Sequence, residues 1–163
     1  MTWEEYKIEA LKTWNKDEFT EEQAFEYIIM KLIEEFGELM GSLAKEKYHN
    51  KPNNNLEELG DIYWYLAVWE SMTEEVPTLS NPFCGDVVDE ICYCLTNLIN
   101  VRSYTPVKWT NRYLAKIKTS VDGTGWELGF DKREDIWIAN ITKLRLRHGK
   151  SYNAKHYTGE QNG

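Results

Sequence analysis

Two acidic clusters interrupt stretches that otherwise have the pattern of buried helix. The first is Glu34-Glu35-Phe36-Gly37-Glu38, and the second is Glu57-Glu58-Leu59-Gly60-Asp61. Carboxylates rarely lie in a protein core unless an opposite charge or a metal ion compensates them. A fold for this chain must therefore pack apolar helix faces together and still accommodate acidic side chains between them.

The composition indicates a single globular domain. Of 163 residues, 42% are hydrophobic, and the 7 Trp and 10 Tyr add large side chains, so a core can form without disulfides. The net charge of -8 argues against non-specific binding to nucleic acid. The start, Trp3-Glu4-Glu5, does not resemble a signal peptide, and no apolar run is long enough to cross a membrane. The cysteines Cys84, Cys92 and Cys94 lack metal-binding spacing, so we expect reduced, mostly buried thiols in a cytoplasmic protein.

Helical periodicity and capping signals predict an all-α fold. We expect helices over residues 3–14, 20–48, 55–70, 86–102, 105–119 and 131–148. The predicted N-terminal caps are Thr2, Thr20, Asn55, Thr105 and Asp131. Residues 122–125 are expected to form a hairpin turn or an irregular loop. In the helix over residues 86–102, the side chains expected to face inward are Val88, Ile91, Cys92, Leu95 and Ile99.

Helix phase brings four carboxylates together. Glu35 follows Ile28 by two helical turns and therefore lies on the apolar stripe, and Glu38 is one turn further. Glu58 and Asp61 are one turn apart on the inner face of the next helix. Two antiparallel helices would aim all four at one point, where they need a counter-charge. Oxygen ligands favour Mg2+, which Mn2+ can replace.

One other interpretation of the acidic residues stays open, and a second is disfavoured. Two surface helices with solvated charges would show a similar density of Glu and Asp. A di-iron carboxylate bundle would need ExxH motifs, and the three histidines, His49, His148 and His156, do not supply them.

The amino-acid sequence of these motifs resembles that of the MazG-like nucleoside triphosphate pyrophosphohydrolases, within the all-α NTP pyrophosphatase superfamily. The resemblance begins with Glu34-Glu35-x-x-Glu38 followed, about twenty residues later, by Glu58-x-x-Asp61. It extends through Ile62-Tyr63-Trp64-Tyr65-Leu66 and to Asn140-Ile141-Thr142-Lys143-Leu144-Arg145-Leu146-Arg147, which resembles the closing NxxKLxxR helix. The opening helix, Trp3 to Trp14, is similar to that of small phage-type members.

The resemblance implies a domain over residues 1–150 with a four-helix-bundle-like core, followed by a polar tail over residues 151–163. Residues 75–125 would be an inserted helical pair that adds interface or covers the nucleobase. The implied metal ligands are Glu35, Glu38, Glu58 and Asp61. A competing register would use Glu34 and Glu57 instead, and Glu34 could otherwise help to activate water.

The predicted substrate-binding residues lie on three helices. The resemblance implies a phosphate contact for Tyr65. Asn140, Lys143 and Arg147 share one face of the last helix. Taken alone they would be solvated residues that complement the helix dipole, but beside the acidic clusters and the resemblance they are expected to bind a triphosphate. Lys45 is a weaker candidate for reaching phosphate.

These residues together predict Mg2+-dependent hydrolysis of a (d)NTP to a (d)NMP and pyrophosphate. A related hydrolase would act on dUTP, phosphoribosyl-ATP or an alarmone, and a non-catalytic helical oligomer could retain the same fold. We expect no nucleic-acid or membrane partner. We also expect a homodimer or homotetramer in the cytoplasm, which is a host's cytoplasm if the chain is phage-encoded.

Overall fold

All the regular secondary structure in the residues that the structure describes is helical. The computed structural model describes residues 1–73, 85–104 and 110–154, which contain six α-helices, one 3-10 helix and no strand, so the all-α prediction is confirmed. The elements in chain order are α1 (Trp3–Leu11), η1 (Lys16–Glu18), α2 (Glu21–His49), α3 (Asn55–Ser71), α4 (Val87–Tyr104), α5 (Thr110–Glu127) and α6 (Arg133–Ala154). Across these ranges, no helix combines the length and the apolar character needed to cross a membrane.

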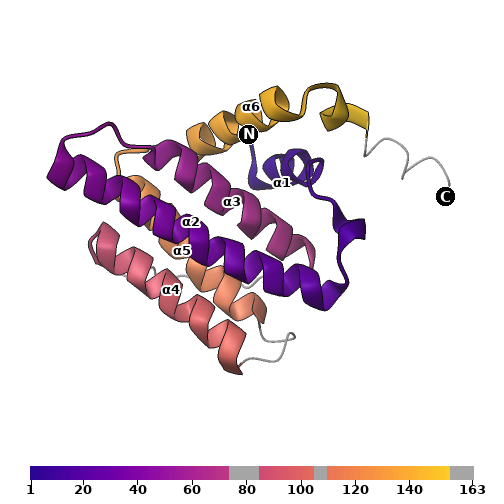
Figure 1. The fold of residues 1–163 in the computed structure, drawn as a ribbon, viewed down its shortest axis with the longest axis horizontal. Coiled ribbons are helices and arrows are strands. Elements are labelled where there is room, and N and C mark those ends of the chain that lie inside the picture. The colour runs from indigo at the N-terminus through magenta and orange to yellow at the C-terminus, as the bar shows by residue number, and fades with distance from the viewer. Residues whose placement is uncertain (74–84, 105–109, 155–163) are drawn as a thin grey trace.

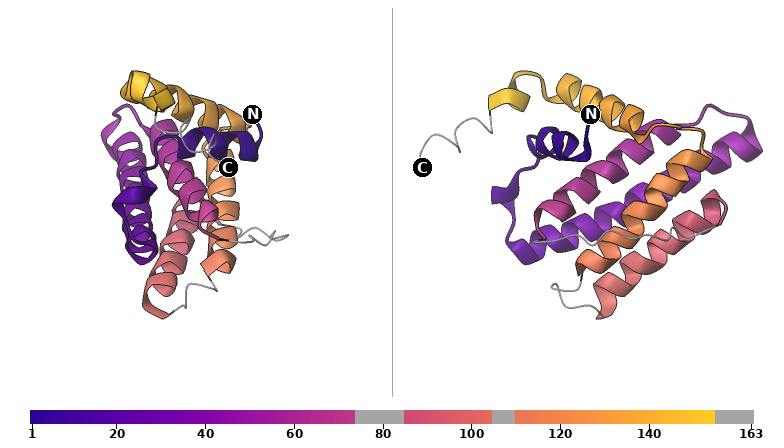
Figure 2. Two further views of the ribbon diagram at one scale, coloured as in Figure 1. Left: turned by 90° about the vertical axis from the view of Figure 1, so that its right-hand side faces the viewer. Right: turned by 180° about the vertical axis from the view of Figure 1, so that it is seen from behind.

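Helix α3 lies at the centre of the molecule and contacts four other helices. It packs against α2 and α5, and its other side is covered by α1 and α6 (Figure 1). Helices α4 and α5 pack against each other and extend the assembly on the side away from α1 and α6, as the turned views show (Figure 2). The pairing of α2 with α3 is the one that positions the two acidic clusters.

The burial of α3 follows from its sequence, which is apolar on nearly every face. The fully buried residues of this helix are Leu59, Ile62, Tyr63, Leu66, Ala67, Val68 and Trp69. The predicted stripe of α2 is also buried, and it consists of Ala24, Ile28, Leu32, Glu35 and Leu39. Carboxylates on the facing sides of these two helices are therefore held in surroundings of low polarity.

Local capping signals account for where the first two long helices begin. Thr2 and Thr20 each form the predicted capping box, with Glu5 and Gln23 respectively. Helix α2 ends at Asn50, whose φ of 47° lies in the left-handed region that Asn tolerates.

Two predicted caps were wrong. Asn54, not Asn55, occupies the cap position of α3. The Asn55 side chain is instead buried, and its Oδ1 accepts a hydrogen bond from Ser42 Oγ at 2.8 Å, which ties the start of α3 to α2. Helix α6 begins at Arg133, two residues after the predicted cap Asp131.

The prediction of a turn over residues 122–125 was wrong, because α5 continues through them to Glu127. Val121 and Thr124 are fully buried there, so packing outweighs the low helix propensity of glycine. Of the two glycines, only Gly125 lies where an added side chain would be crowded. A Cβ added at Gly123 would lie 3.6 Å from Glu90 of α4, and one at Gly125 would lie 3.3 Å from Ile136 of α6.

The prediction of which α4 side chains face the core was largely wrong. Ile91 is buried as expected, but the rest of the stripe consists of Cys94, Leu98 and Val101. Val88 and Ile99 are about half exposed, Cys92 is exposed and Leu95 is only half-buried. Helix α4 carries apolar residues on two faces, and its contacts with α2 and α5 select between them.

Several expectations concern the segment between α3 and α6 and the end of the chain. The buried residues of α4 and α5 belong to the same core as those of α2 and α3, so this helical pair is an integral part of the fold. The predicted cap Thr105 and the thiol of Cys84 lie outside the described residues. Gly149 interrupts α6 at the predicted helix end, and a further helical turn follows it to Ala154.

Gly60 allows α3 and α6 to approach closely. A Cβ added there would lie 2.9 Å from Cβ of Asn140, a separation that the packing cannot accept without movement of α6. We expect Gly60→Ala to lower the free energy of unfolding in urea by about 1 to 3 kcal/mol. Gly41→Ala is the matched control, because nothing lies within 4 Å of an added Cβ there. It should leave stability unchanged or raise it by up to about 1 kcal/mol, and equal losses in the two variants would contradict the packing argument.

Candidate metal centre

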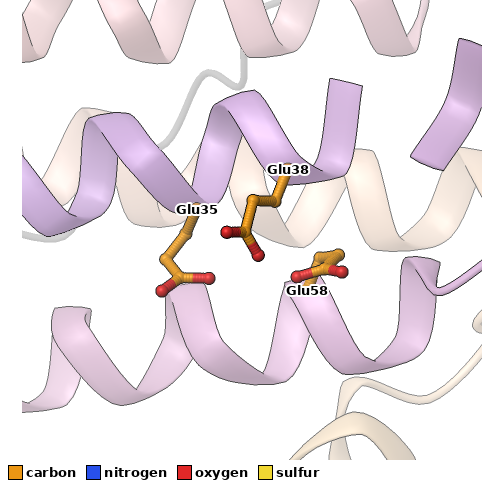
Figure 3. A group of neighbouring side chains, drawn as sticks. All are labelled: Glu35, Glu38 and Glu58. Atoms are coloured by element: carbon orange, nitrogen blue, oxygen red, sulfur yellow. The ribbon is translucent and has the colours of Figure 1, made fainter. Parts of the chain in front are cut away.

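Three glutamates converge between α2 and α3. Glu35 and Glu38 extend from α2, Glu58 extends from α3, and the three carboxylates point toward one another (Figure 3). One oxygen of each lies within 4.8 Å of one oxygen of the other two. This convergence is the one that helix phase predicted for these three residues.

Two of the three converging glutamates are buried and the third is exposed. Glu35 is 7% exposed and Glu58 is 9% exposed, whereas Glu38 is exposed. A cation could therefore enter from the Glu38 side and be held against the two buried carboxylates. Lys31 Nζ, 3.9 Å from Glu35, is too distant to donate a hydrogen bond to it.

Burial and mutual repulsion make it costly for these carboxylates to ionise. Burial raises the pKa of Glu35 to about 7, the charges of Asp61 and Glu38 add to the effect, and Lys31 opposes it. The pKa of Glu58 is also raised to about 7, mainly by burial and then by the charges of Glu38 and Asp61. A divalent cation at this point would remove the repulsion that both shifts reflect.

Asp61, the predicted fourth ligand, lies outside this group. Its Oδ1 accepts a hydrogen bond from Asn140 Nδ2 at 3.1 Å and another from Lys143 Nζ. Both donors come from α6, which packs directly on α3. Periodicity within α3 alone could not reveal this, because the residues that hold Asp61 are about eighty positions later in the chain.

Lys143 and Arg147, predicted to bind phosphate, contact carboxylates of α3. Lys143 Nζ lies 3.3 Å from Glu57 Oε1, and Arg147 Nη2 lies 3.1 Å from the same oxygen. Glu57 is thus engaged with α6, and the exposed Glu34 pairs with Lys31. The competing ligand register through Glu34 and Glu57 therefore gains no support from the geometry.

A cavity of about 260 Å³ adjoins the acidic centre. It combines carboxylates, an arginine and aromatic rings, and its lining residues are Thr13, Glu35, Asp61, Trp64, Tyr65, Leu144, Arg147 and His148. Tyr65, predicted to contact substrate, is 9% exposed, and burial raises the pKa of its hydroxyl. Lys45 is exposed further along α2 and is not one of the residues that line this cavity.

Three residues near the cavity were missing from the predicted site. The Tyr6 hydroxyl, fully buried, donates to Asn140 Oδ1 at 2.9 Å and so orients that side chain. Thr13 and His148 line the cavity from the chain near α1 and from α6. The position of Tyr6 on the inner face of α1 was readable from periodicity, but its partner was not.

The donor set fits a hard divalent cation. All three converging ligands are carboxylates, which Mg2+ and Mn2+ prefer, and phosphate or water oxygens can complete the shell. Comparisons of the chain with protein-family models, with curated proteins and with solved structures found no match. The MazG-like resemblance therefore stays a prediction from the motifs.

The pKa shifts predict how stability depends on pH when no divalent cation is present. The unfolded carboxyl groups have a pKa near 4.5, whereas those of Glu35 and Glu58 in the native protein are about 7. Between these values the native state keeps protons that the unfolded chain has lost, so rising pH destabilises the native state. The penalty grows until the pH passes about 7 and is constant above it.

Glu35→Gln should remove about half of this slope, since it removes one of two similarly shifted groups. Urea unfolding in EDTA at several pH values between about 5 and 8 measures it. Glu22→Gln, an exposed change on the same helix, is the control. The same slope in wild type and Glu35→Gln would show that Glu35 is not the group responsible.

Proposed function

We propose that this chain is a Mg2+-dependent nucleoside triphosphate pyrophosphohydrolase of the MazG-like type. It would convert a (d)NTP and water to a (d)NMP and pyrophosphate. The observation that carries the proposal is the convergence of Glu35, Glu38 and Glu58 beside a cavity that also holds Arg147 and aromatic side chains. Binding an NTP requires carboxylates that hold a metal ion, a positively charged side chain that binds phosphate, and aromatic rings that contact the base.

Glu35, Glu38 and Glu58 would hold the cation. When bound, Mg2+ neutralises charge on the phosphates and lowers the pKa of water. Glu35 also lines the cavity, so its carboxylate is placed to take a proton from water as a new oxygen–phosphorus bond forms. The bond between the phosphorus that water attacks and the oxygen that bridges it to the next phosphate then breaks, and pyrophosphate leaves.

Residues that line the cavity, together with Lys143 and Asn140 beside it, would orient the nucleotide. Arg147 and Lys143 on α6 supply donors for the outer phosphates, and Asn140 stands one turn before Lys143 on the same face. Trp64 and Tyr65 offer ring faces for the base or sugar, and their rings meet edge to face with centroids 4.8 Å apart. The Trp64 indole donates to Thr13 Oγ1 at 2.9 Å, which fixes the orientation of the ring.

Assembly into a homodimer or homotetramer, acting in the cytoplasm, is part of the proposal. Leu146 of α6 is 80% exposed and Ile8 of α1 is 62% exposed, and these two helices pack side by side. Exposed apolar residues on neighbouring helices favour burial against another subunit.

The first test is pyrophosphate release from each of the eight common (d)NTPs with Mg2+. We expect release from at least one of them. Glu38→Gln should lower kcat/KM on the order of 100-fold, because even residues that only support metal ligands cost up to that factor. Glu22→Gln serves as the control, since this exposed residue lies far along α2 from the centre. Hydrolysis confined to dUTP, phosphoribosyl-ATP or an alarmone would identify the related hydrolases instead, and unchanged release by Glu38→Gln would contradict the site.

The second test separates an enzyme from a non-catalytic helical oligomer. A cation that binds only the native state raises Tm, and at about a hundredfold excess over Kd we expect about 5 to 10 °C. Thermal unfolding of wild type and Glu38→Gln with Mg2+ or EDTA measures the shift. The variant should show little response to Mg2+. A wild-type protein whose Tm is the same in both buffers would favour the non-catalytic oligomer.

A further inference from the structure

Lys143 reaches from α6 toward α3 and contacts two carboxylates of that helix, beside the three converging glutamates. Its Nζ donates to Asp61 Oδ1 and lies 3.3 Å from Glu57 Oε1. The Lys143 side chain is 18% exposed and that of Asp61 is 25% exposed, so the pair is largely removed from solvent. Salt therefore screens this ion pair less than it screens a fully exposed one.

A second contact holds Asp61 toward α6. Asn140 is 3% exposed, and its Nδ2 donates to the same Asp61 oxygen at 3.1 Å. The Tyr6 hydroxyl donates to Asn140 Oδ1, which commits the amide nitrogen to Asp61. Because Gly60 has no side chain, Asn140 can approach α3 closely enough to make this contact.

These contacts set Asp61 apart from the converging glutamates. In the part of the chain that the structure describes, the oxygens within 4.8 Å of one another belong to Glu35, Glu38 and Glu58. Asp61 nevertheless lines the same cavity as Glu35. Its carboxylate is therefore close to the metal centre while its charge is compensated by Lys143.

We propose that Lys143 is an exchangeable counter-ion that keeps Asp61 out of the metal centre until a polyphosphate binds, an inference that rests on the proposed function. A triphosphate carries more charge and more acceptor oxygens than one carboxylate, so it is the stronger partner for the ammonium group. As Lys143 turns to phosphate, Asp61 becomes available to the divalent cation beside the three glutamates.

The consequence is a coupling between two ligands through the protein. A polyphosphate that removes Lys143 from Asp61 raises the affinity for the cation, and the cation raises the affinity for the polyphosphate by the same factor. Arg147 is poised in the same way, since its Nη2 lies 3.1 Å from Glu57 and its side chain is 60% exposed. Lys143 and Arg147 thus pair with carboxylates in the free protein and with phosphate in the complex.

The inference is tested by measuring Mn2+ binding in the absence of nucleotide. The paramagnetic signal of free Mn2+ reports how much of the ion is bound. Lys143→Met should bind Mn2+ about five-fold more tightly than wild type, because the pair that competes for Asp61 is gone. Its affinity for inorganic triphosphate in EDTA should fall about ten-fold. Lys143→Arg, which keeps the charge, should retain weak Mn2+ binding.

Two controls separate the ion pair from general charge. Arg145→Met removes a positive charge from the same helix, where Arg145 pairs with Glu9 at 2.9 Å, and should leave Mn2+ affinity unchanged. In an Asp61→Asn background, Lys143→Met should no longer tighten Mn2+ binding, since the partner that it releases is absent. Circular dichroism checks that each variant is folded.

The possible results separate this inference from the proposed function. Equal Mn2+ affinity in wild type and Lys143→Met, with binding lost in Glu38→Gln, would overturn the counter-ion role and leave the metal centre standing. Tighter Mn2+ binding by Lys143→Met that persists in the Asp61→Asn background would overturn the counter-ion role as well. Mn2+ binding that Glu38→Gln does not weaken would overturn both proposals. Tighter binding by Lys143→Met in a protein that hydrolyses no nucleotide would support the counter-ion role and contradict the hydrolase.

Discussion

The burial of mutually repelling carboxylates between α2 and α3 is the constraint on which the rest of the structure depends. Glu35 and Glu58 are more than nine-tenths buried, and each faces further acidic groups. The free protein meets part of this cost by protonation near neutral pH and part by the cations of α6. Protonation and ion pairing are both reversible. A site that binds a transient cation and an anionic substrate requires this property.

The fold supplies the rigidity that the site needs. Helix α3 is enclosed by α1, α2, α5 and α6, so the backbone that carries Glu58 and Asp61 cannot move away from α2 to relieve the repulsion. Helix α6 is held against α3 by the Asn140–Asp61 hydrogen bond and by the absence of a side chain at Gly60. The acidic centre and the cationic helix are thereby held at contact distance although they are far apart in sequence.

Residues whose surroundings lie within one helix pair could be predicted from the sequence. Helical period placed Glu35 among buried side chains, because its phase with Ile28 is a local property. The same rule failed for α4, where apolar residues on two faces leave the choice between Cys94 and Ile99 to the neighbouring helices. The partners of Asp61 were also beyond local pattern, because they depend on how closely α6 approaches α3.

We propose that Glu35, Glu38 and Glu58 together bind a divalent cation. Anomalous scattering from crystals grown with Mn2+ would locate that cation. We expect a strong peak between α2 and α3 with an oxygen of each glutamate in its coordination shell. Well-ordered glutamates with no peak between them, or a peak only at other acidic residues, would contradict it.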